Sequence, residues 1–428
     1  MGEAATYLHL DTLIAPVSLR VDDTYLRALP SVFPNWPFAL RDTFEQPPFA
    51  SVTRREGGYT LTSPFMDRSV THNDPVDSLC ALIVEIAWAR LRQDTHLLCL
   101  HGAAVEFSGR LVVFPSTRRA GKSTLTVALA SAGKTVFTDD FLPLQIGDNN
   151  RIEGLSHGIS PRLRLPVPSQ FGSRAEAYIA AHPGISNERY RYITPAPADL
   201  ARFNQSAPIG ALVFLERAEG RDPHIEETTA AETLRTLITQ NFSRAMNAAG
   251  ILKVLGAVAE QTPAYRLQYD AVEPAIALLE SRFVNWQHPP ATFAGTPEES
   301  LFASALETDG WASGPDIGTA TLLQAPGITE VSTDGERFLS GRNGKSIHNL
   351  NDGAAMIWRL LEEPATAGEI VEMLHAVFPE QKKETIHSDV METLAAFAAN
   401  GLLVSGSGIC QSGEIPAETA AEHVNGKQ

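Results

Sequence analysis

The sequence predicts an α/β fold for the central part of the chain, with a β-rich segment before it and a small winged-helix-like α+β domain after it. Three observations lead to this prediction. Residues 111–138 have the pattern of an apolar strand, a loop, a helix and a second strand. Strand and helix patterns alternate again over residues 209–282. Residues 317–406 combine two or three short strands with three helix patterns, which is the content of a winged-helix module.

The composition is that of a globular protein with two or three domains. The chain has 428 residues, of which 43% are hydrophobic and 20% are charged. A formal net charge of −16 argues against a general nucleic-acid binder. The three cysteines lack metal-binding or redox spacing, so we expect a cytoplasmic protein. No apolar run is long enough to span a membrane and no signal peptide is evident, so we expect no membrane partner.

The chain divides into five predicted segments. From the N-terminus they are a β-rich lead-in, the α/β core, a linker, the small domain and a disordered tail, at residues 1–75, 76–285, 286–316, 317–406 and 407–428. The core opens with a strong helix pattern over residues 76–93. The linker is rich in Pro, Gly, Ala, Ser and Thr, and the tail is polar.

A phosphate-binding loop is predicted between the first strand and the first helix of the core. Loop amides and a helix N-terminus attract phosphate oxygens, which points to ATP. The Lys122 ammonium would reach the β- and γ-phosphates, and the Ser123 hydroxyl would bind Mg²⁺. The residues assigned to nucleotide binding are Ser116, Thr117, Arg118, Arg119, Ala120, Gly121, Lys122, Ser123 and Thr124.

The prediction of a phosphate-binding loop depends more on the strand before it and the apolar helix after it than on the Gly-Lys-Ser tripeptide itself. Gly344-Lys345-Ser346 repeats the tripeptide, but no strand precedes it and no apolar helix follows, so we interpret it as a hairpin turn. The first copy also departs from G-x-x-x-x-G-K-[ST], because Ser116 stands where the first glycine is expected.

Two adjacent carboxylates follow the second strand of the core. Asp139 and Asp140 come directly after Val136-Phe137-Thr138, at the carboxyl end of a strand, where open α/β sheets place ligands. One carboxylate would hold the metal ion, and the other would accept the proton of an attacking hydroxyl. The residues alone leave the assignment between the two open.

A histidine and a pair of arginines are further candidates. His101 ends an apolar run, and it is either a hydrogen-bonded core histidine or a group near the phosphates or the acceptor. Arg162 and Arg164 alternate with leucines, so both face one side of a predicted strand. An arginine there would either stabilise charge during phosphoryl transfer or lie on a solvated edge. Arg164 is the one assigned to the catalytic site.

The motifs of the core resemble the HPr kinase/phosphorylase family and its kinase-like relatives. The matching motifs are His101-Gly102 with Val105, Gly121-Lys122-Ser123 and Asp139-Asp140, in the family's order. The resemblance implies a phosphoenolpyruvate-carboxykinase-like fold, ATP, Mg²⁺ and phosphoryl transfer to a hydroxyl. It favours Asp139 as the base and leaves Ser123 and Asp140 to the metal. Members of that family form rings, and a homo-oligomer stays open for this chain.

Residues 317–406 resemble the PqqD family of peptide-binding domains, also called RiPP recognition elements. The matching residues are Leu350-Asn351, Ala354, Ile357-Trp358, Glu369-Ile370, Asp389-Val390 and Gly401-Leu402-Leu403. The resemblance implies that a leader or substrate peptide adds as a strand to the sheet edge. The alternative, a DNA-binding winged helix, is disfavoured because the third helix contains Asp389 and Glu392 and little positive charge.

We therefore expect an ATP-dependent kinase that phosphorylates a hydroxyl, serine above all, on a small protein or ribosomally made peptide. The C-terminal domain would capture this acceptor and raise its local concentration. The alternative is a non-catalytic, nucleotide-binding scaffold that presents a peptide to a partner enzyme. A kinase for a small metabolite is a third hypothesis, which the peptide-binding-like domain makes less attractive.

Overall fold

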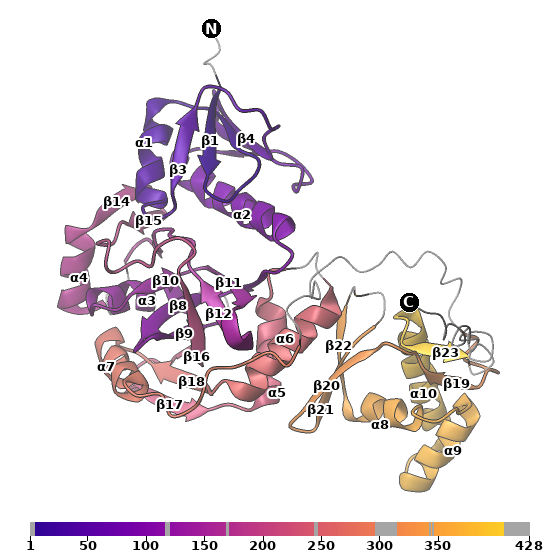
Figure 1. Ribbon diagram of the computed structural model, residues 1–428. Coiled ribbons are helices and arrows are strands. Elements are labelled where there is room, and N and C mark those ends of the chain that lie inside the picture. The colour runs from indigo at the N-terminus through magenta and orange to yellow at the C-terminus, as the bar shows by residue number, and fades with distance from the viewer. Residues whose placement is uncertain are drawn as a thin grey trace, which may run out of the picture. The chain divides into compact units, whose positions relative to one another are not determined.

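The computed structural model describes residues 5–115, 120–167, 171–243, 247–295, 315–341, 344 and 346–405 (Figure 1). The chain separates into two compact units, residues 1–304 with 331–335, and residues 305–330 with 336–428. Each unit contains both helices and sheets, so the mixed α/β architecture is confirmed. None of the helices in the described ranges has the length and hydropathy that a bilayer crossing requires.

A six-stranded sheet is the first layer of unit one. Its order is β3-β1-β2-β4-β5-β6, and only β2 and β4 pair in parallel. The strands are β1 (Thr6–Leu10), β2 (Val17–Arg20), β3 (Phe38–Arg41), β4 (Ala50–Arg55), β5 (Gly58–Thr62) and β6 (Val70–His72). The helices α1 (Asp23–Val32) and α2 (Pro75–Gln93) lie against it (Figure 1).

Helix α2 shares the hydrophobic core of this sheet. Asp74 accepts a hydrogen bond from the Asp77 amide, and Pro75 stands in the first turn, so the helix begins where its sequence favours a start. Leu79, Leu82 and Ile86 are fully buried in the same cluster as the apolar side chains of β1 and β2. The core of the β-rich lead-in therefore extends beyond residue 75.

A nine-stranded sheet is the centre of unit one. The strands run β10-β8-β9-β16-β12-β11-β7, with β18 beside β16 and β17 beside β18. They are β7 (Leu98–His101), β8 (Ala103–Phe107), β9 (Arg110–Phe114), β10 (Val136–Thr138), β11 (Phe141–Ile146), β12 (Ile152–Leu155), β16 (Ser206–Arg217), β17 (His224–Glu227) and β18 (Ala264–Tyr269). The long strand β16 is parallel to β9 and β18 and antiparallel to β12. It joins the two halves of the sheet.

Helices and a small sheet complete unit one. The helices are α3 (Lys122–Ser131), α4 (Gly172–Ala181), α5 (Ala230–Gln240), α6 (Ala248–Gln261) and α7 (Val272–Phe283). The strands β13 (Arg162–Arg164), β15 (Tyr190–Ile193) and β14 (Pro183–Ser186) form a three-stranded sheet. Residues 169–205 read as irregular in sequence, yet they contain α4, β14 and β15, because Ala175 and Ile179 form a short buried stripe against α3.

Unit two combines small sheets with three helices. Strands β21 (Glu336–Ser340) and β22 (Ile347–Leu350) pair in a sheet whose third strand, β20 (Thr329–Thr333), is divided between the two units at residue 331, and β19 (Leu322–Gln324) pairs with β23 (Leu403–Ser405). The helices are α8 (Asp352–Leu360), α9 (Ala367–Val377) and α10 (Lys383–Ala399). Thr366 and Glu369 form a capping box at the start of α9. Most of the predicted GRNGK turn and the whole predicted tail at 407–428 lie outside the described residues.

Candidate functional site

Side chains from three chain segments meet in one contact chain. His101 ends β7, Lys122 opens α3, and Asp140 lies in the turn between β10 and β11. Lys122 Nζ is 3.3 Å from His101 Nε2, and His101 Nδ1 is 3.1 Å from Asp140 Oδ1. One imidazole therefore connects the first turn of the helix to the acidic turn.

A second set of contacts surrounds Asp139. The Ser123 hydroxyl donates to Asp139 Oδ2 over 2.8 Å, and the backbone amide of Arg162 donates to the same oxygen over 3.0 Å. The guanidinium of Arg162 also lies 3.7 Å from Asp140 Oδ2. Asp139 is 9% exposed. The structure thus brings Lys122, Ser123, His101, Asp139 and Asp140 together.

Backbone hydrogen bonds fix the direction of the acidic pair. Thr138 Oγ1 accepts from the amides of Asp140 and Phe141, at 3.2 and 3.1 Å. The amide of Gly102 donates to the Asp140 carbonyl over 2.9 Å. These bonds satisfy the turn without using either carboxylate, so both side chains remain oriented toward α3 and β7.

Gly121 is a position that only glycine fills without strain. It precedes α3 with a φ of +100°, a left-handed conformation that L side chains rarely adopt. A Cβ atom there would lie 2.8 Å from the hydroxyl of Tyr269, whose ring carries the guanidinium of Arg217 at 4.6 Å. Sequence reasoning missed Tyr269 and Arg217, because nothing in their local pattern connects β18 and β16 to this loop.

The two carboxylates differ in acidity. Burial and the neighbouring charge of Asp140 raise the pKa of Asp139 to about 6. Burial also acts to raise the pKa of Asp140, but the hydrogen bond from His101 and the charges of Arg162 and Lys122 outweigh it and lower that pKa. At neutral pH Asp140 is therefore firmly ionised, while Asp139 titrates only slightly below neutrality.

The oxygen donors of this site fit a shared magnesium ion. Carboxylate and hydroxyl oxygens are the ligands that Mg²⁺ prefers, and it commonly takes one or two carboxylates together with substrate phosphates. Across the described residues, no three His, Cys, Asp or Glu side chains are grouped to hold a metal by themselves. Ser123 and Asp140, the residues predicted to bind the metal, would therefore form only a partial ligand set, which substrate phosphates would have to complete.

The structure describes only some of the remaining predicted site residues. Ser116, Thr117, Arg118 and Arg119 lie outside the described residues. Ala120 and Thr124 are half-buried on either side of Gly121 and Lys122.

The two arginines of β13 lie in different surroundings. Arg164 is exposed and lies 5.6 Å from the ring of Tyr190, whereas Arg162 is the arginine that contacts the acidic pair. Alternation in the sequence predicts that both arginines lie on the same face of β13, so only the three-dimensional structure shows that their surroundings differ.

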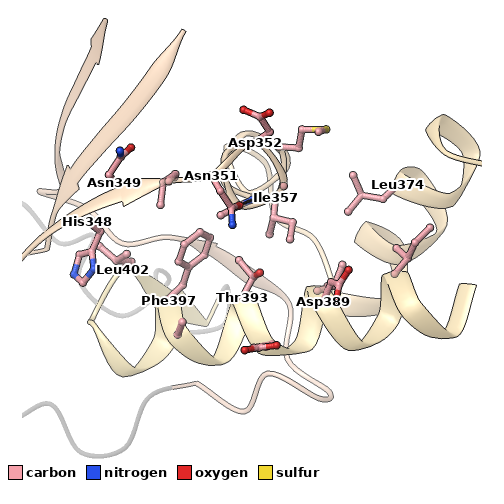
Figure 2. Close-up of a pocket in the computed structure, with 18 of the residues that line it drawn as sticks. His348, Asn349, Asn351, Asp352, Ile357, Leu374, Asp389, Thr393, Phe397 and Leu402 are labelled. Atoms are coloured by element: carbon pink, nitrogen blue, oxygen red, sulfur yellow. Dashed lines mark hydrogen bonds between the residues drawn. The ribbon is translucent and has the colours of Figure 1, made fainter. Parts of the chain in front are cut away.

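A groove in unit two is a second candidate site. It has a volume of about 870 Å³ and is lined by β22, α8, α9 and α10. Figure 2 shows Ile357 of α8 and Thr393 and Phe397 of α10 facing one another across it. The side chain of Asn351 accepts the Ala354 amide at the start of α8, which fixes the connection from β22 to this helix. Among the described residues, β22 pairs only with β21, so its other edge is unpaired, and residues 348–350 of β22 line the groove.

A family model matches the part of the chain that contains β21, β22 and the three helices. Residues 336–403 match Coenzyme PQQ synthesis protein D (PqqD). The predicted resemblance to PqqD is therefore confirmed, and these residues form a PqqD-like domain. The groove lies within the matched range, since its lining residues run from His348 to Leu402.

No curated protein matches the chain. Among solved structures, the Hpr(Ser) kinase/phosphatase from Coxiella burnetii is similar to this chain at 14% sequence identity, over 43% of this chain and 91% of that chain, with a TM-score of 0.21.

Proposed function

We propose that this protein is an ATP-dependent kinase that transfers the γ-phosphoryl group to a hydroxyl, serine above all, of a peptide or small protein. The contact chain Lys122–His101–Asp140, beside the Ser123–Asp139 hydrogen bond, carries the proposal. It places a cation for phosphates, a hydroxyl for a metal ion and two carboxylates next to one helix N-terminus. A cytoplasmic location is part of this proposal, and the sparse cysteines support it.

The nucleotide phosphates bind at the start of α3. The positive end of the helix dipole and the backbone amides after Gly121 attract phosphate oxygens, and the Lys122 ammonium adds a full charge. Residues 120–124 lie at this end of the helix, and the absence of a side chain at Gly121 lets the backbone approach the phosphates. Ser123 and Asp140 would hold Mg²⁺. When bound, this ion neutralises charge on the β- and γ-phosphates.

Asp139 is the base for the acceptor hydroxyl. A carboxylate with a pKa of about 6 is mostly ionised at neutral pH and still basic enough to take a proton. The hydroxyl oxygen bonds to the γ-phosphorus, and its proton moves to Asp139. The bond from the γ-phosphorus to the β,γ-bridging oxygen breaks, and that oxygen leaves on ADP with the electron pair. Lys122 and an arginine of β13 stabilise the charge of this transition state.

The PqqD-like domain supplies the acceptor. A peptide bound in its groove would remain tethered to the kinase unit, which raises the local concentration of the acceptor hydroxyl. Acceptor recognition and phosphoryl transfer would then take place in different domains.

The test is Mg²⁺·ATP binding and phosphoryl transfer by wild type, Lys122→Ala and Asp139→Asn. The acceptors offered are short candidate peptides, including any that are encoded beside this protein's gene. We expect wild type alone to phosphorylate a peptide, Lys122→Ala to lose nucleotide affinity, and Asp139→Asn to keep it. Nucleotide and peptide binding without transfer to any acceptor would favour the scaffold, and no nucleotide binding at all would refute the kinase.

A further inference from the structure

Among the described residues, the rim of the groove of the PqqD-like domain carries acidic side chains and neither lysine nor arginine. The charged side chains that line it in the described part of the chain are Asp352, Asp389 and Glu392, and neither a lysine nor an arginine is among them. All three carboxylates are exposed, and within the described residues none forms an ion pair. Asp389 and Glu392 are three residues apart on α10, so they project from the same face of the helix.

The floor of the groove is apolar and open. Ile357 and Phe397 are buried, and Leu374 is half-buried beside them. Figure 2 shows these side chains between α8, α9 and α10. Ala396 lines the groove with only a methyl group, which leaves room for a chain against α10. A strand added to the edge of β22 would place alternate side chains over this floor.

The C-terminal tail of the chain has the wrong charge to fill this groove. The tail at 407–428 contains Glu414, Glu418 and Glu422 against one Lys427. Like charges would repel it from the rim carboxylates, so charge complementarity selects a basic segment of another molecule.

We propose that the groove binds an extended peptide segment in which apolar residues alternate with lysine or arginine. The apolar side chains cover Ile357 and Phe397, and the basic side chains reach Asp389 and Glu392 along their aliphatic stems. This inference rests on the proposed peptide capture, and it names the chemistry of the captured segment.

The test selects a displayed library of random short peptides on the full-length protein, without ATP. Fluorescence anisotropy then measures the affinity of the best synthetic peptide. We expect selected sequences that combine apolar residues with an excess of lysine and arginine. Asp389→Asn with Glu392→Gln should weaken binding roughly two- to fivefold for each carboxylate removed, with the loss shrinking at high salt. The matched control, Glu362→Gln with Glu384→Gln, removes two exposed carboxylates outside the groove and should leave affinity unchanged.

Other results would overturn the inference. Selected peptides with no excess of basic residues would do so, as would an unchanged affinity in the groove variant. A gain in affinity after deletion of residues 407–428 would show that the tail occupies the groove instead. Lys122→Ala should bind the peptide like wild type, so a failure of the kinase proposal is distinguishable from a failure of this one.

Discussion

His101 contacts Asp140 through Nδ1 and Lys122 through Nε2, at 3.1 and 3.3 Å. If Nδ1–H donates to the carboxylate, the lone pair of Nε2 faces the lysine ammonium, so a neutral imidazole satisfies both partners. The same residue thereby orients the Lys122 ammonium and the acidic turn. This relationship makes His101 a positioning residue of the proposed kinase.

Replacing His101 by alanine should slow phosphoryl transfer. The change removes a hydrogen bond to a charged group on each side, and such bonds contribute about 1.5–3 kcal/mol. We expect kcat/KM to fall about ten- to a hundredfold, with the fold retained. Steady-state kinetics on the phosphopeptide product measures this. His96→Ala, at an exposed position, is the control, and equal losses in both variants would contradict the role.

The pH dependence of transfer should report Asp139. Because burial and Asp140 raise its pKa to about 6, the base is protonated in acid and ionised at neutral pH. We expect kcat/KM to rise with pH and to level off above about 6. Rates measured from about pH 5 to pH 8 at saturating Mg²⁺ give the profile. A profile that is flat through this interval would remove Asp139 from the role of base.

Stability should show the opposite trend at the same residue. The folded pKa of about 6 exceeds the ordinary value of 3.8, so the folded state binds more protons between these values. Ionising Asp139 therefore costs stability as pH rises toward 6, with a slope of at most about 1.4 kcal/mol per pH unit. The free energy of unfolding of wild type, relative to Asp139→Asn, should fall over this interval. A relative stability that rises with pH instead would show that the carboxylate is better stabilised in the folded state.

Gly121→Ala should damage the nucleotide site. The new Cβ meets the Tyr269 hydroxyl at 2.8 Å, and φ is +100°, so we expect a loss of about 1–3 kcal/mol and weaker ATP binding. Gly133→Ala is a matched control, since φ there is +78° but nothing lies within 4 Å.

A second variant separates the contact from the backbone strain at Gly121. Adding Tyr269→Phe to Gly121→Ala should restore part of the stability, because it removes the contacting hydroxyl. If the double variant is no more stable than Gly121→Ala, the loss comes from backbone strain alone. Thermal unfolding and calorimetry with Mg²⁺·ATP measure both effects.

The groove can be blocked without removing a charge. Ala396→Trp would fill the space beside α10, whereas Ala395→Trp places the same side chain at an exposed neighbouring position that does not line the groove. We expect only the first variant to lose peptide affinity, by more than about tenfold, because the peptide then meets a filled volume. Anisotropy with a peptide that wild type binds is the measurement. Equal affinity of both variants would place the peptide elsewhere.

Much of the local structure follows from the sequence. Apolar periodicity predicts β9, α3 and β10 close to their observed limits, and the turn signals at residues 147–150 predict the β11–β12 hairpin, which forms around a short 3₁₀ turn. These features depend on neighbours in sequence. Apolar periodicity did not predict helix α4, because only two of its residues, Ala175 and Ile179, are buried.

Parts of the site depend on tertiary placement and could not be predicted. The alternation in β13 gives Arg162 and Arg164 the same face, but only the fold puts the Arg162 amide on Asp139. The contact of Tyr269 with the space beside Gly121 likewise joins segments that are distant in sequence. Residue identity thus indicated the chemistry of the site, whereas its geometry required the sheet order.

Strand β16 connects the two sides of the proposed kinase site within one sheet. Ala207 and Pro208 pair with β12, and Ile209 to Leu212 pair with β9. Strand β9 leads into the phosphate-binding segment, while β12 continues the hairpin that starts after the acidic turn. Opening either side exposes amides of the same strand, so amide hydrogen exchange should slow together in β9, β11 and β12 when nucleotide binds. A ligand that binds at one end of α3 would therefore slow amide hydrogen exchange in these three strands together.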